Sequence, residues 1–297
     1  MSHVRNSPPL RPSGRASAGA ISNGVRKISC SVGILTRNSA ATLARTLDSV
    51  RDFDDIIICD GGSADATLDI AREYGARIIL QDTRFKDASG AVIDFGGVKN
   101  QCLAAAKNDW YLSLDSDETI SEGLRDAIQR IAEEGGKELV YRVPIGILID
   151  GRYIEHSSNY PGYQYRFFNK KSGAHFIKPV HERIAFTAMT PIGTLQHPWY
   201  IHTTKSDWRN YLKDSAKYRS LEARLYCARS LGEHLRYTVF GNIRTSAAVV
   251  LRSAYNYAMY GFSNSMPLSG EMGRALVPLF LMCQILWCAI LKPAQTK

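Results

Sequence analysis

Short apolar runs alternate with amphipathic stretches from residue 28 onward. Four of these runs are mostly apolar, and two of them end at acidic residues, which predicts buried strands. They cover residues 28–35, 55–60, 76–80 and 109–115. The intervening stretches carry apolar residues three and four positions apart, as at Leu43, Leu47 and Val50, and predict helices. Strands that alternate with helices at this spacing predict parallel βαβ units covered on both faces.

The pattern changes in the second half of the chain. Residues 163–169 ("YQYRFFN") and 176–186 ("FIKPVHERIAF") are predicted as two strands of one hairpin over the same sheet edge. Three helical segments follow, over residues 206–232, 237–260 and 274–291. The chain is therefore predicted to comprise a tail (1–26), an α/β domain (27–205) and a helical extension (206–297).

The charge is distributed unevenly along the chain, which indicates what kind of surface the protein binds. The formal net charge is +9, but residues 28–199 carry 19 basic and 23 acidic residues, whereas residues 200–297 carry 13 basic and five acidic ones. The tail is basic, lacks the apolar segment of a secretion signal and has a composition typical of disorder. Two basic ends fit an anionic membrane surface. They contain no recognisable nucleic-acid motif, so no nucleic-acid partner is expected.

Six cysteines are spread along the chain without a CxxC pair. Neither a disulfide framework nor a zinc site is therefore expected. This pattern fits a reducing, cytoplasmic setting.

Acidic residues follow two of the predicted strands. The stretch "YLSLDSDE" ends in Asp115, Asp117 and Glu118, and "DIIICD" ends at Asp60. Ligands of an open parallel sheet bind at the carboxyl ends of its strands. Two carboxylates two residues apart can share one hard cation, and Mg²⁺ or Mn²⁺ would offset the charge of a diphosphate there. Taken alone, "DSD" fits a solvated acidic turn equally well.

Four motifs in this order resemble family 2 glycosyltransferases with the GT-A fold, and most of all bacterial lipopolysaccharide-core glycosyltransferases. They are "ISCSVGILTRN", "IIICDGGSADAT", "KNQCLAAAKNDWYLSLDSDE" and "YQYRFFNKKSGAHFIKPVHERI". The resemblance covers residues 28–205. It implies a GT-A type α/β fold with a mostly parallel nucleotide-sugar-binding sheet and, here, a C-terminal helical extension. No GxGxxG follows the first strand, which disfavours a dinucleotide-binding domain.

The resemblance also assigns a donor site. Asp60 would contact the base or ribose, or else be a simple turn residue. Asp117 would bind the metal directly and Asp115 the metal or the ribose. His202 would contact the metal or the diphosphate as a third ligand, or else be a structural histidine. Lys99 would pair with phosphate, or else be a solvated lysine at a helix start. The residues implied to bind the nucleotide sugar are Thr36, Arg37, Asp60, Lys99, Asp115 and Asp117.

Family 2 enzymes invert the anomeric centre, so the resemblance implies a base for the acceptor hydroxyl. Glu182 in "VHER" is the favoured base and Glu118 is the rival. Arg166 and Arg183 would contact the diphosphate or a phosphorylated acceptor, or else be surface arginines. The QxxRW motif of processive members is absent, because Gln164 and Arg166 have the wrong spacing and no Trp follows. We therefore expect transfer of a single sugar.

The last predicted helices point to a membrane surface. Residues 275–291 contain 17 residues without a charge. Arg244 and Arg252 would lie on one face of the preceding helix, opposite Phe240 and Leu251, which is typical of a helix in a membrane interface. The alternatives are a packed helical subdomain, a face that pairs with a second copy in a homodimer, and a true membrane span.

The sequence thus predicts an inverting, metal-dependent glycosyltransferase, peripheral on the cytoplasmic, inner face of the membrane. It would add one UDP-linked hexose to a lipid-linked glycan such as lipopolysaccharide core. The alternatives are a glycosyltransferase acting on polyprenyl phosphate or a protein, and a non-catalytic sugar-nucleotide binder.

Overall fold

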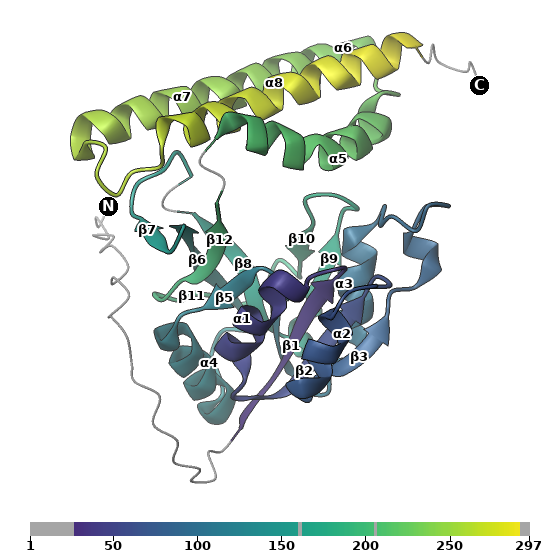
Figure 1. Ribbon diagram of the computed structural model, residues 1–297, viewed down its shortest axis with the longest axis vertical. Coiled ribbons are helices and arrows are strands. Elements are labelled where there is room, and N and C mark those ends of the chain that lie inside the picture. Colours follow the sequence, from purple (N-terminus) through teal and green to yellow (C-terminus); the bar gives the residue numbers. More distant parts are fainter. Residues whose placement is uncertain (1–26, 160–161, 205–206, 292–297) are drawn as a thin grey trace. The chain divides into compact units, whose positions relative to one another are not determined.

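The computed structural model describes residues 27–159, 162–204 and 207–291. These residues pack as two compact units, whose elements are labelled in Figure 1. The first unit contains the chain up to Gly146 together with Gly162–Ile201, and the second contains Ile147–Pro161 and the chain from His202 onward. The predicted basic tail, residues 1–26, lies outside the described residues.

The main sheet follows the strand order β3-β2-β1-β4-β8-β6-β12-β5. Its strands are β1 (Ile28–Thr36), β2 (Phe53–Asp60), β3 (Arg77–Leu80), β4 (Trp110–Asp115), β5 (Glu118–Ile120), β6 (Val140–Ile149), β8 (Tyr163–Asn169) and β12 (Trp199–Thr203), and β11 (Ile192–Thr194) pairs with β6. Strands β3, β2, β1 and β4 are parallel, as predicted from their apolar runs. Strand β8 is antiparallel to both β4 and β6.

Helices cover both faces of the parallel strands. On one face, Leu47 of α1 and Leu124 of α4 belong to the hydrophobic cluster around Val32 of β1. On the other face, Val98 of α3 packs in a cluster with Tyr111 of β4. Because neither face meets water, the strands are apolar at successive positions rather than at alternate ones. The helices of this unit are α1 (Ala40–Val50), α2 (Thr67–Glu73), α3 (Phe95–Ala104) and α4 (Glu122–Glu134), with 3₁₀ turns η1 (Thr83–Phe85) and η2 (Lys170–Ser172).

One predicted pairing is wrong. Strand β8 does not form a hairpin with the segment that follows it, because it is inserted into the main sheet between β4 and β6. After η2, Gly173 adopts a left-handed conformation (φ 70°) that redirects the chain. Strands β9 (His175–Ile177) and β10 (Arg183–Ala185) then pair with each other in a separate antiparallel ladder, which we call the β9–β10 hairpin.

The register of the parallel strands brings polar residues to one edge. Thr36 of β1 is opposite Asp60 of β2, and Leu35 of β1 is opposite Asp115 of β4. The strands therefore end side by side, with Thr36, Asp60 and Asp115 at their carboxyl ends. This edge is where open α/β sheets bind ligands.

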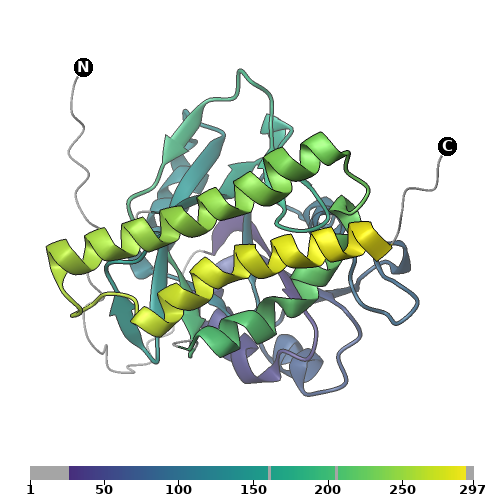
Figure 2. The same ribbon diagram turned by 90° about the horizontal axis from the view of Figure 1, so that it is seen from above.

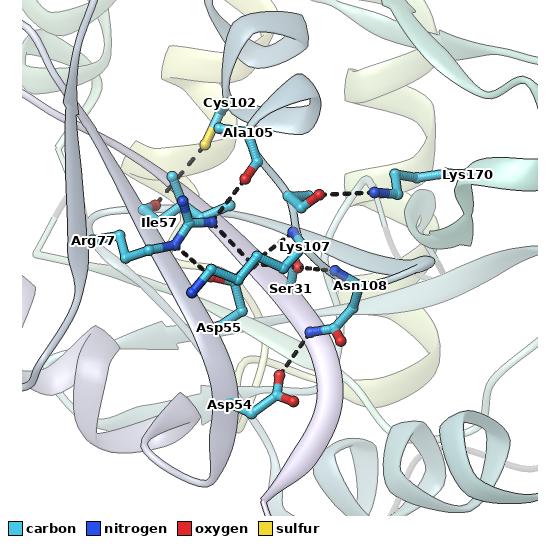
Figure 3. A network of polar contacts seen from close by, with 11 residues as sticks. Ser31, Asp54, Asp55, Ile57, Arg77, Cys102, Ala105, Lys107, Asn108 and Lys170 are labelled. Carbon is cyan, nitrogen blue, oxygen red and sulfur yellow. Dashed lines mark hydrogen bonds and ion pairs between the residues drawn. The ribbon is translucent and has the colours of Figure 1, made fainter.

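A closed polar network lies near the amino ends of the same strands (Figure 3). Asp55 of β2 accepts hydrogen bonds from Ser31 Oγ at 2.5 Å, from the Lys107 backbone N–H at 3.0 Å and from Arg77 Nε at 2.8 Å. Arg77 also donates to the Ala105 carbonyl at 2.7 Å. Burial would raise the pKa of Asp55, but Arg77, Ser31 and the Lys107 N–H together hold it below its usual value. The network ties the chain entering β4 to β1, β2 and β3.

The second unit is mainly helical, which confirms the predicted C-terminal helical extension. Helix α8 lies alongside α5 and α7 (Figures 1 and 2). A Cβ added at Gly273 of α8 would lie 2.7 Å from Cβ of Tyr211 in α5, so glycine permits this close contact. Buried Glu271 of α8 accepts hydrogen bonds from the N–H of Ser158 at 2.8 Å and from its hydroxyl at 2.6 Å. The elements are β7 (Arg152–Ile154), α5 (Trp208–Tyr226), α6 (Leu231–Glu233), the π-helical η3 (His234–Phe240), α7 (Gly241–Tyr260) and α8 (Leu268–Leu291).

The six cysteines form no disulfide among the described residues, and they differ between the units. Those of the first unit, Cys30, Cys59 and Cys102, are fully buried. Burial raises the pKa of Cys59 to about 12 and that of Cys102 to about 11. In the second unit Cys283 is exposed, and Cys227 and Cys288 are half-buried.

Candidate active site

The acidic turn between β4 and β5 is held in place from two directions. The backbone N–H of Asp115 donates to Glu118 Oε2 at 2.8 Å, which closes the turn on itself. Thr46 Oγ1 of α1 donates to the carbonyl of Ser116 at 3.0 Å, and Ser39 Oγ lies 2.9 Å from Ser116 Oγ. The turn therefore presents its carboxylates from a fixed backbone. The contacts of Ser39 and Thr46 with Ser116 were not predicted from the sequence, because no local pattern links these residues.

Asp115 lies between two buried cations. Lys99 Nζ of α3 is 3.1 Å from Oδ1 of Asp115, and Arg166 Nη2 of β8 is 3.8 Å from Oδ2. Burial would raise the pKa of Asp115, but Lys99 and then Arg166 hold it below its usual value. Asp115 is therefore ionised at neutral pH.

Lys99 connects this carboxylate to a second one. Its ammonium group also contacts Oε1 of Glu182, the residue that precedes β10. Burial alone would lower the pKa of Lys99, but the charges of Asp115 and Glu182 raise it above its usual value. Lys99 is only 4% exposed. It is therefore a buried, charged bridge, and the alternative of a solvated lysine is wrong.

Glu118, the rival base, is enclosed by Arg166. Arg166 Nη1 donates to Glu118 Oε2 at 2.7 Å, and Nη2 donates to Oε1 at 3.0 Å. Glu118 is 4% exposed, and burial raises its pKa to about 8 in spite of Arg166. With both oxygens engaged in this way, Glu118 is suited to holding Arg166 and the acidic turn in place.

Arg166 is buried, so it is not the surface arginine of the alternative interpretation. Its guanidinium carbon lies 3.9 Å from the ring centroid of Trp199 in β12. Its Nε donates to Gln164 Oε1 at 3.1 Å, and its Nη1 donates to the Ser113 carbonyl at 3.3 Å. Trp199 was missed in the sequence, because it lies far from Arg166 along the chain and belongs to no motif.

These side chains border a pocket of about 590 Å³ within the first unit. Lys99, Asp115 and Arg166 line one part of it, and Glu182 and Arg183 of the β9–β10 hairpin region line another. Its volume is typical of a small-molecule site. The pocket therefore brings together candidates for donor binding and for the base that are widely separated in sequence. The remaining lining residues are Ser113, Tyr163, Gln164, Tyr165, Phe176, His181 and Ile184.

Asp60 lies at the same sheet edge but is engaged by its own loop. Oδ1 accepts hydrogen bonds from Thr36 Oγ1 at 2.8 Å and from Ser63 Oγ at 2.5 Å, and Oδ2 accepts from the N–H groups of Gly62 and Ser63 at 2.8 Å. Burial would raise the pKa of Asp60, but Ser63 and Thr36 hold it below its usual value. Gly62 permits the turn through its positive φ of 90°. Asp60 thus orders this loop, and its predicted contact with the nucleotide stays a prediction.

Two basic side chains tie a further loop to this edge. Arg37 Nη1 donates to the Gly90 carbonyl at 2.7 Å, and Lys86 Nζ donates to the Gly61 carbonyl at 3.1 Å. Among the described residues that line the pocket, Thr36, Arg37 and Asp60 do not appear. They border the sheet edge instead. Lys86 was missed in the sequence, since a single lysine in an irregular stretch gives no signal.

The carboxylates of the acidic turn fit a hard divalent cation in their chemistry, because Mg²⁺ and Mn²⁺ prefer oxygen ligands. Asp117 is exposed, whereas Asp115 is already contacted by Lys99 and Arg166. In the described part of the chain, no three His, Cys, Asp or Glu side chains are grouped to hold a metal ion. A cation here would take its other ligands from water and phosphate. His202 belongs to the second unit, and its role as a third ligand stays a prediction.

Comparison with known proteins shows which family this chain resembles. Residues 31–191 match the family model described as glycosyl transferase family 2. An uncharacterized glycosyltransferase of Rickettsia felis is 30% identical over 141 residues, which cover 46% of this chain and 47% of the relative. The PGL/p-HBAD biosynthesis glycosyltransferase of Mycobacterium bovis is 34% identical over 124 residues, which cover 37% and 44%. The chain spans about half the length of the curated relatives it matches.

A solved structure, S. aureus TarS 1–349 in complex with UDP-GlcNAc, is similar with a TM-score of 0.41 and 14% identity, covering 88% of this chain and 89% of that one. This likeness is distant. The family match covers more than half of the chain and includes Asp60, Asp115 and Glu182.

Proposed function

The chain belongs to glycosyl transferase family 2, and we propose that it transfers a single sugar from a nucleotide sugar to a glycan acceptor. The family and the α/β fold predicted from the sequence are thereby confirmed, whereas the preference for lipopolysaccharide core stays a prediction. The observation that carries the proposal is the pocket where Asp115, Lys99 and Glu182 converge. A carboxylate for the donor and a carboxylate for the acceptor share one buried ammonium group there.

The donor we propose is a UDP-linked hexose whose diphosphate binds at the acidic turn. Asp117, with Asp115, would hold one Mg²⁺ or Mn²⁺ ion, which when bound offsets the charge of the diphosphate leaving group. Arg166 and Arg183 line the pocket and add positive charge for the same group. Thr36, Arg37 and Asp60 at the adjoining edge are the proposed contacts of the nucleoside.

Glu182 is the base that we propose. The acceptor hydroxyl loses its proton to Glu182 while its oxygen attacks the anomeric carbon. The bond from that carbon to the diphosphate oxygen breaks, and the electron pair leaves with the nucleoside diphosphate, so the configuration inverts. Glu182 lines the pocket with 20% of its side chain exposed. Glu118, enclosed by Arg166, lacks such access.

The acceptor that we propose is a lipid-linked glycan, reached from a peripheral position on the cytoplasmic, inner face of the membrane. In the second unit, Leu251 of α7 and Trp287 of α8 are 70% and 64% exposed. Helix α7 also carries the exposed Arg244 and Arg252, and exposed apolar side chains on a basic helix fit an anionic membrane surface. Of the helices in the described residues, α8 alone is long and apolar enough to cross a membrane. Its buried Glu271 favours a helix that lies on the surface.

The donor proposal is tested by measuring binding and slow hydrolysis of a panel of nucleotide sugars with Mg²⁺ or Mn²⁺. Wild type should bind one donor in a metal-dependent way, Asp117→Asn should lose that dependence, and Asp126→Asn on the exposed side of α4 should keep it. If wild type binds no nucleotide sugar with either ion, the proposal fails. Binding without transfer to any acceptor would support the non-catalytic alternative. Transfer to polyprenyl phosphate or to a protein would show that the acceptor is not the proposed lipid-linked glycan.

The membrane proposal is tested by flotation of the full chain with anionic and neutral liposomes. Replacing Phe240, Leu251 and Trp287 together by serine should reduce flotation with anionic liposomes. Leu80→Ser in the first unit removes an apolar side chain of similar exposure (68%) and should not reduce it. Equal flotation of all proteins would reject this surface. A stable dimer that does not float would favour the second-copy alternative.

A further inference from the structure

Helix α3 contacts the β9–β10 hairpin through a second side chain besides Lys99. Asn100 Nδ2 donates to the Phe176 carbonyl at 2.8 Å, and the Phe176 N–H donates to Asn100 Oδ1 at 2.8 Å. Phe176 is the central residue of β9, whose next residue, Ile177, is paired with Arg183. The Asn100 amide therefore occupies the place of a neighbouring strand along β9, satisfying both backbone groups of one residue.

The start of α3 approaches the turn of the hairpin just as closely. The Phe95 N–H donates to the Pro179 carbonyl at 2.9 Å. A Cβ added at Gly96 would lie 2.5 Å from the Lys178 carbonyl oxygen, which is closer than real Cβ atoms come to other atoms. Only glycine lets the helix meet the turn at this distance.

The turn that α3 contacts is strained. Lys178 and His181 have positive φ angles of 74° and 50°, although neither is glycine. Such a conformation costs on the order of 1–3 kcal/mol per residue and persists only where surrounding contacts enforce it. Glu182 follows His181 directly, so the shape of the turn decides where its carboxylate lies.

We propose that Asn100 and Gly96 are positioning residues for the catalytic base. By fixing the β9–β10 hairpin and its strained turn against α3, they hold Glu182 in contact with Lys99 at the pocket. The inference rests on the proposed function, because it takes Glu182 to be the base. It predicts a larger effect on the transfer step than on donor binding, since Arg183 is the one proposed donor contact on the hairpin, whereas Asp60, Asp115 and Asp117 lie on other elements.

The chain offers a matched control next to Asn100. Gln101 Nε2 donates to the Leu80 carbonyl at 2.8 Å, and Gln101 Oε1 accepts from the Asp82 N–H at 3.0 Å. Gln101 thus makes the same kind of double contact from the same helix, but with the end of β3 instead of the hairpin. Asn100→Ala should lower kcat by about 10- to 100-fold, because a displacement of about 1 Å can cost this much. Gln101→Ala should leave kcat within about twofold.

Two further readouts separate positioning from general loss of structure. Amide hydrogen exchange in residues 175–185 should rise in Asn100→Ala and stay at the wild-type level in Gln101→Ala. The KM for the donor should change by less than about twofold in both variants. Gly96→Ala, which pushes the Lys178 carbonyl away, should repeat the kcat loss and the faster exchange of Asn100→Ala.

The proposal is overturned if exchange of residues 175–185 is unchanged in Asn100→Ala, or if it rises while kcat stays at the wild-type value. It is also overturned if Asn100→Ala raises the donor KM alone, or if Gln101→Ala lowers kcat equally. If wild type transfers no sugar from any donor, the proposed function itself fails. The exchange comparison still shows in that case whether Asn100 holds the hairpin.

Discussion

Two aspartates near opposite ends of the parallel strands have different surroundings: the side chain of Asp55 is 2% exposed and that of Asp115 is 41% exposed. Asp55, near the amino ends, accepts hydrogen bonds from Ser31, Arg77 and the Lys107 backbone, all within 3.1 Å. Asp115, at the carboxyl ends, has a cation at 3.1 Å and another at 3.8 Å and borders a pocket. In both cases the partners hold the pKa below its usual value against the effect of burial.

The difference lies in the balance of charge. The network at the amino ends pairs one carboxylate with one guanidinium and completes it with hydroxyl and backbone donors. At the carboxyl ends, Asp115, Glu118 and Glu182 share two cations, Lys99 and Arg166. Burial, and to a smaller extent the charge of Asp115, raises the pKa of Glu118 to about 8 in spite of Arg166. A surplus of carboxylates beside a pocket is typical of functional sites, which agrees with the proposed role of this sheet edge.

The largest effect is expected for Glu182→Gln. Its kcat for transfer should fall by about 10²–10⁴-fold, because the amide cannot accept the acceptor proton. The unfolding midpoint should stay close to that of wild type, since Lys99 keeps its contact with Asp115. Steady-state kinetics and thermal unfolding measure the two quantities. A kcat within about tenfold of wild type would exclude Glu182 as the base and make Glu118→Gln the next variant to measure.

Asp55→Asn should lower the stability of the protein and leave its activity unchanged, which is the opposite of the effect expected for Glu182→Gln. Removing one charge of a buried pair costs about 3 kcal/mol of unfolding free energy, at the low end of the usual range because 35% of the Arg77 side chain is exposed. Donor KM and kcat of the folded variant should be unchanged. Denaturant titration measures the loss, and a specific drop in donor affinity would contradict a purely structural role.

Arg166→Lys should lower both the unfolding free energy and the affinity for the donor by moderate amounts. Lysine cannot donate to both Glu118 oxygens in the arginine geometry or stack in the same way on Trp199. We expect a loss of about 2 kcal/mol in unfolding free energy, accompanied by weaker donor binding. Arg72→Lys on the exposed face of α2 is the control and should change neither. A stable variant with normal donor binding would show that the arginine geometry at position 166 is needed neither for stability nor for donor binding.

The smallest effect is the pH dependence of stability that Asp55 contributes. Its pKa in the folded protein lies below the ordinary value of 3.8, so its contribution is complete above that value and is lost as the pH falls below it. Asp55→Asn should therefore unfold with a flatter acid dependence than wild type. Urea titrations at a series of acidic pH values measure the slope, and Asp126→Asn should keep the wild-type slope. A wild-type slope in Asp55→Asn would show that Asp55 does not contribute to the acid dependence of stability.

The parallel half of the sheet and its acidic edge could be predicted because their signals are local. Continuous apolar runs define the strands, and the βαβ order makes neighbouring strands end at the same edge. Asp60 and Asp115 therefore reach that edge in the structure as expected. The contact of Lys99 with both Asp115 and Glu182 adds a link that the motifs alone do not specify.

The antiparallel half could not be predicted in the same way. Arg166 and Trp199 meet because β8, β6 and β12 are neighbours in the sheet, and no short pattern in the sequence encodes that order. The wrong hairpin for residues 163–186 has the same cause. The Asn100 contact with Phe176 was missed because an asparagine inside a helix normally predicts nothing. The metal ligands and the base stay predictions, since they depend on a bound substrate.

The exposed and the buried cysteines lie in different units, so a thiol reagent can label the two units at different rates. Thiolates react with maleimides, and a buried thiol with a raised pKa is protected twice, by sterics and by protonation. A short pulse of reagent on the native protein should therefore mark Cys283 first, while Cys59 and Cys102 react only when the first unit opens. A fluorophore placed in this way would report on the helical unit, and the slow reaction of the buried thiols would time the unfolding of the α/β unit in the same sample.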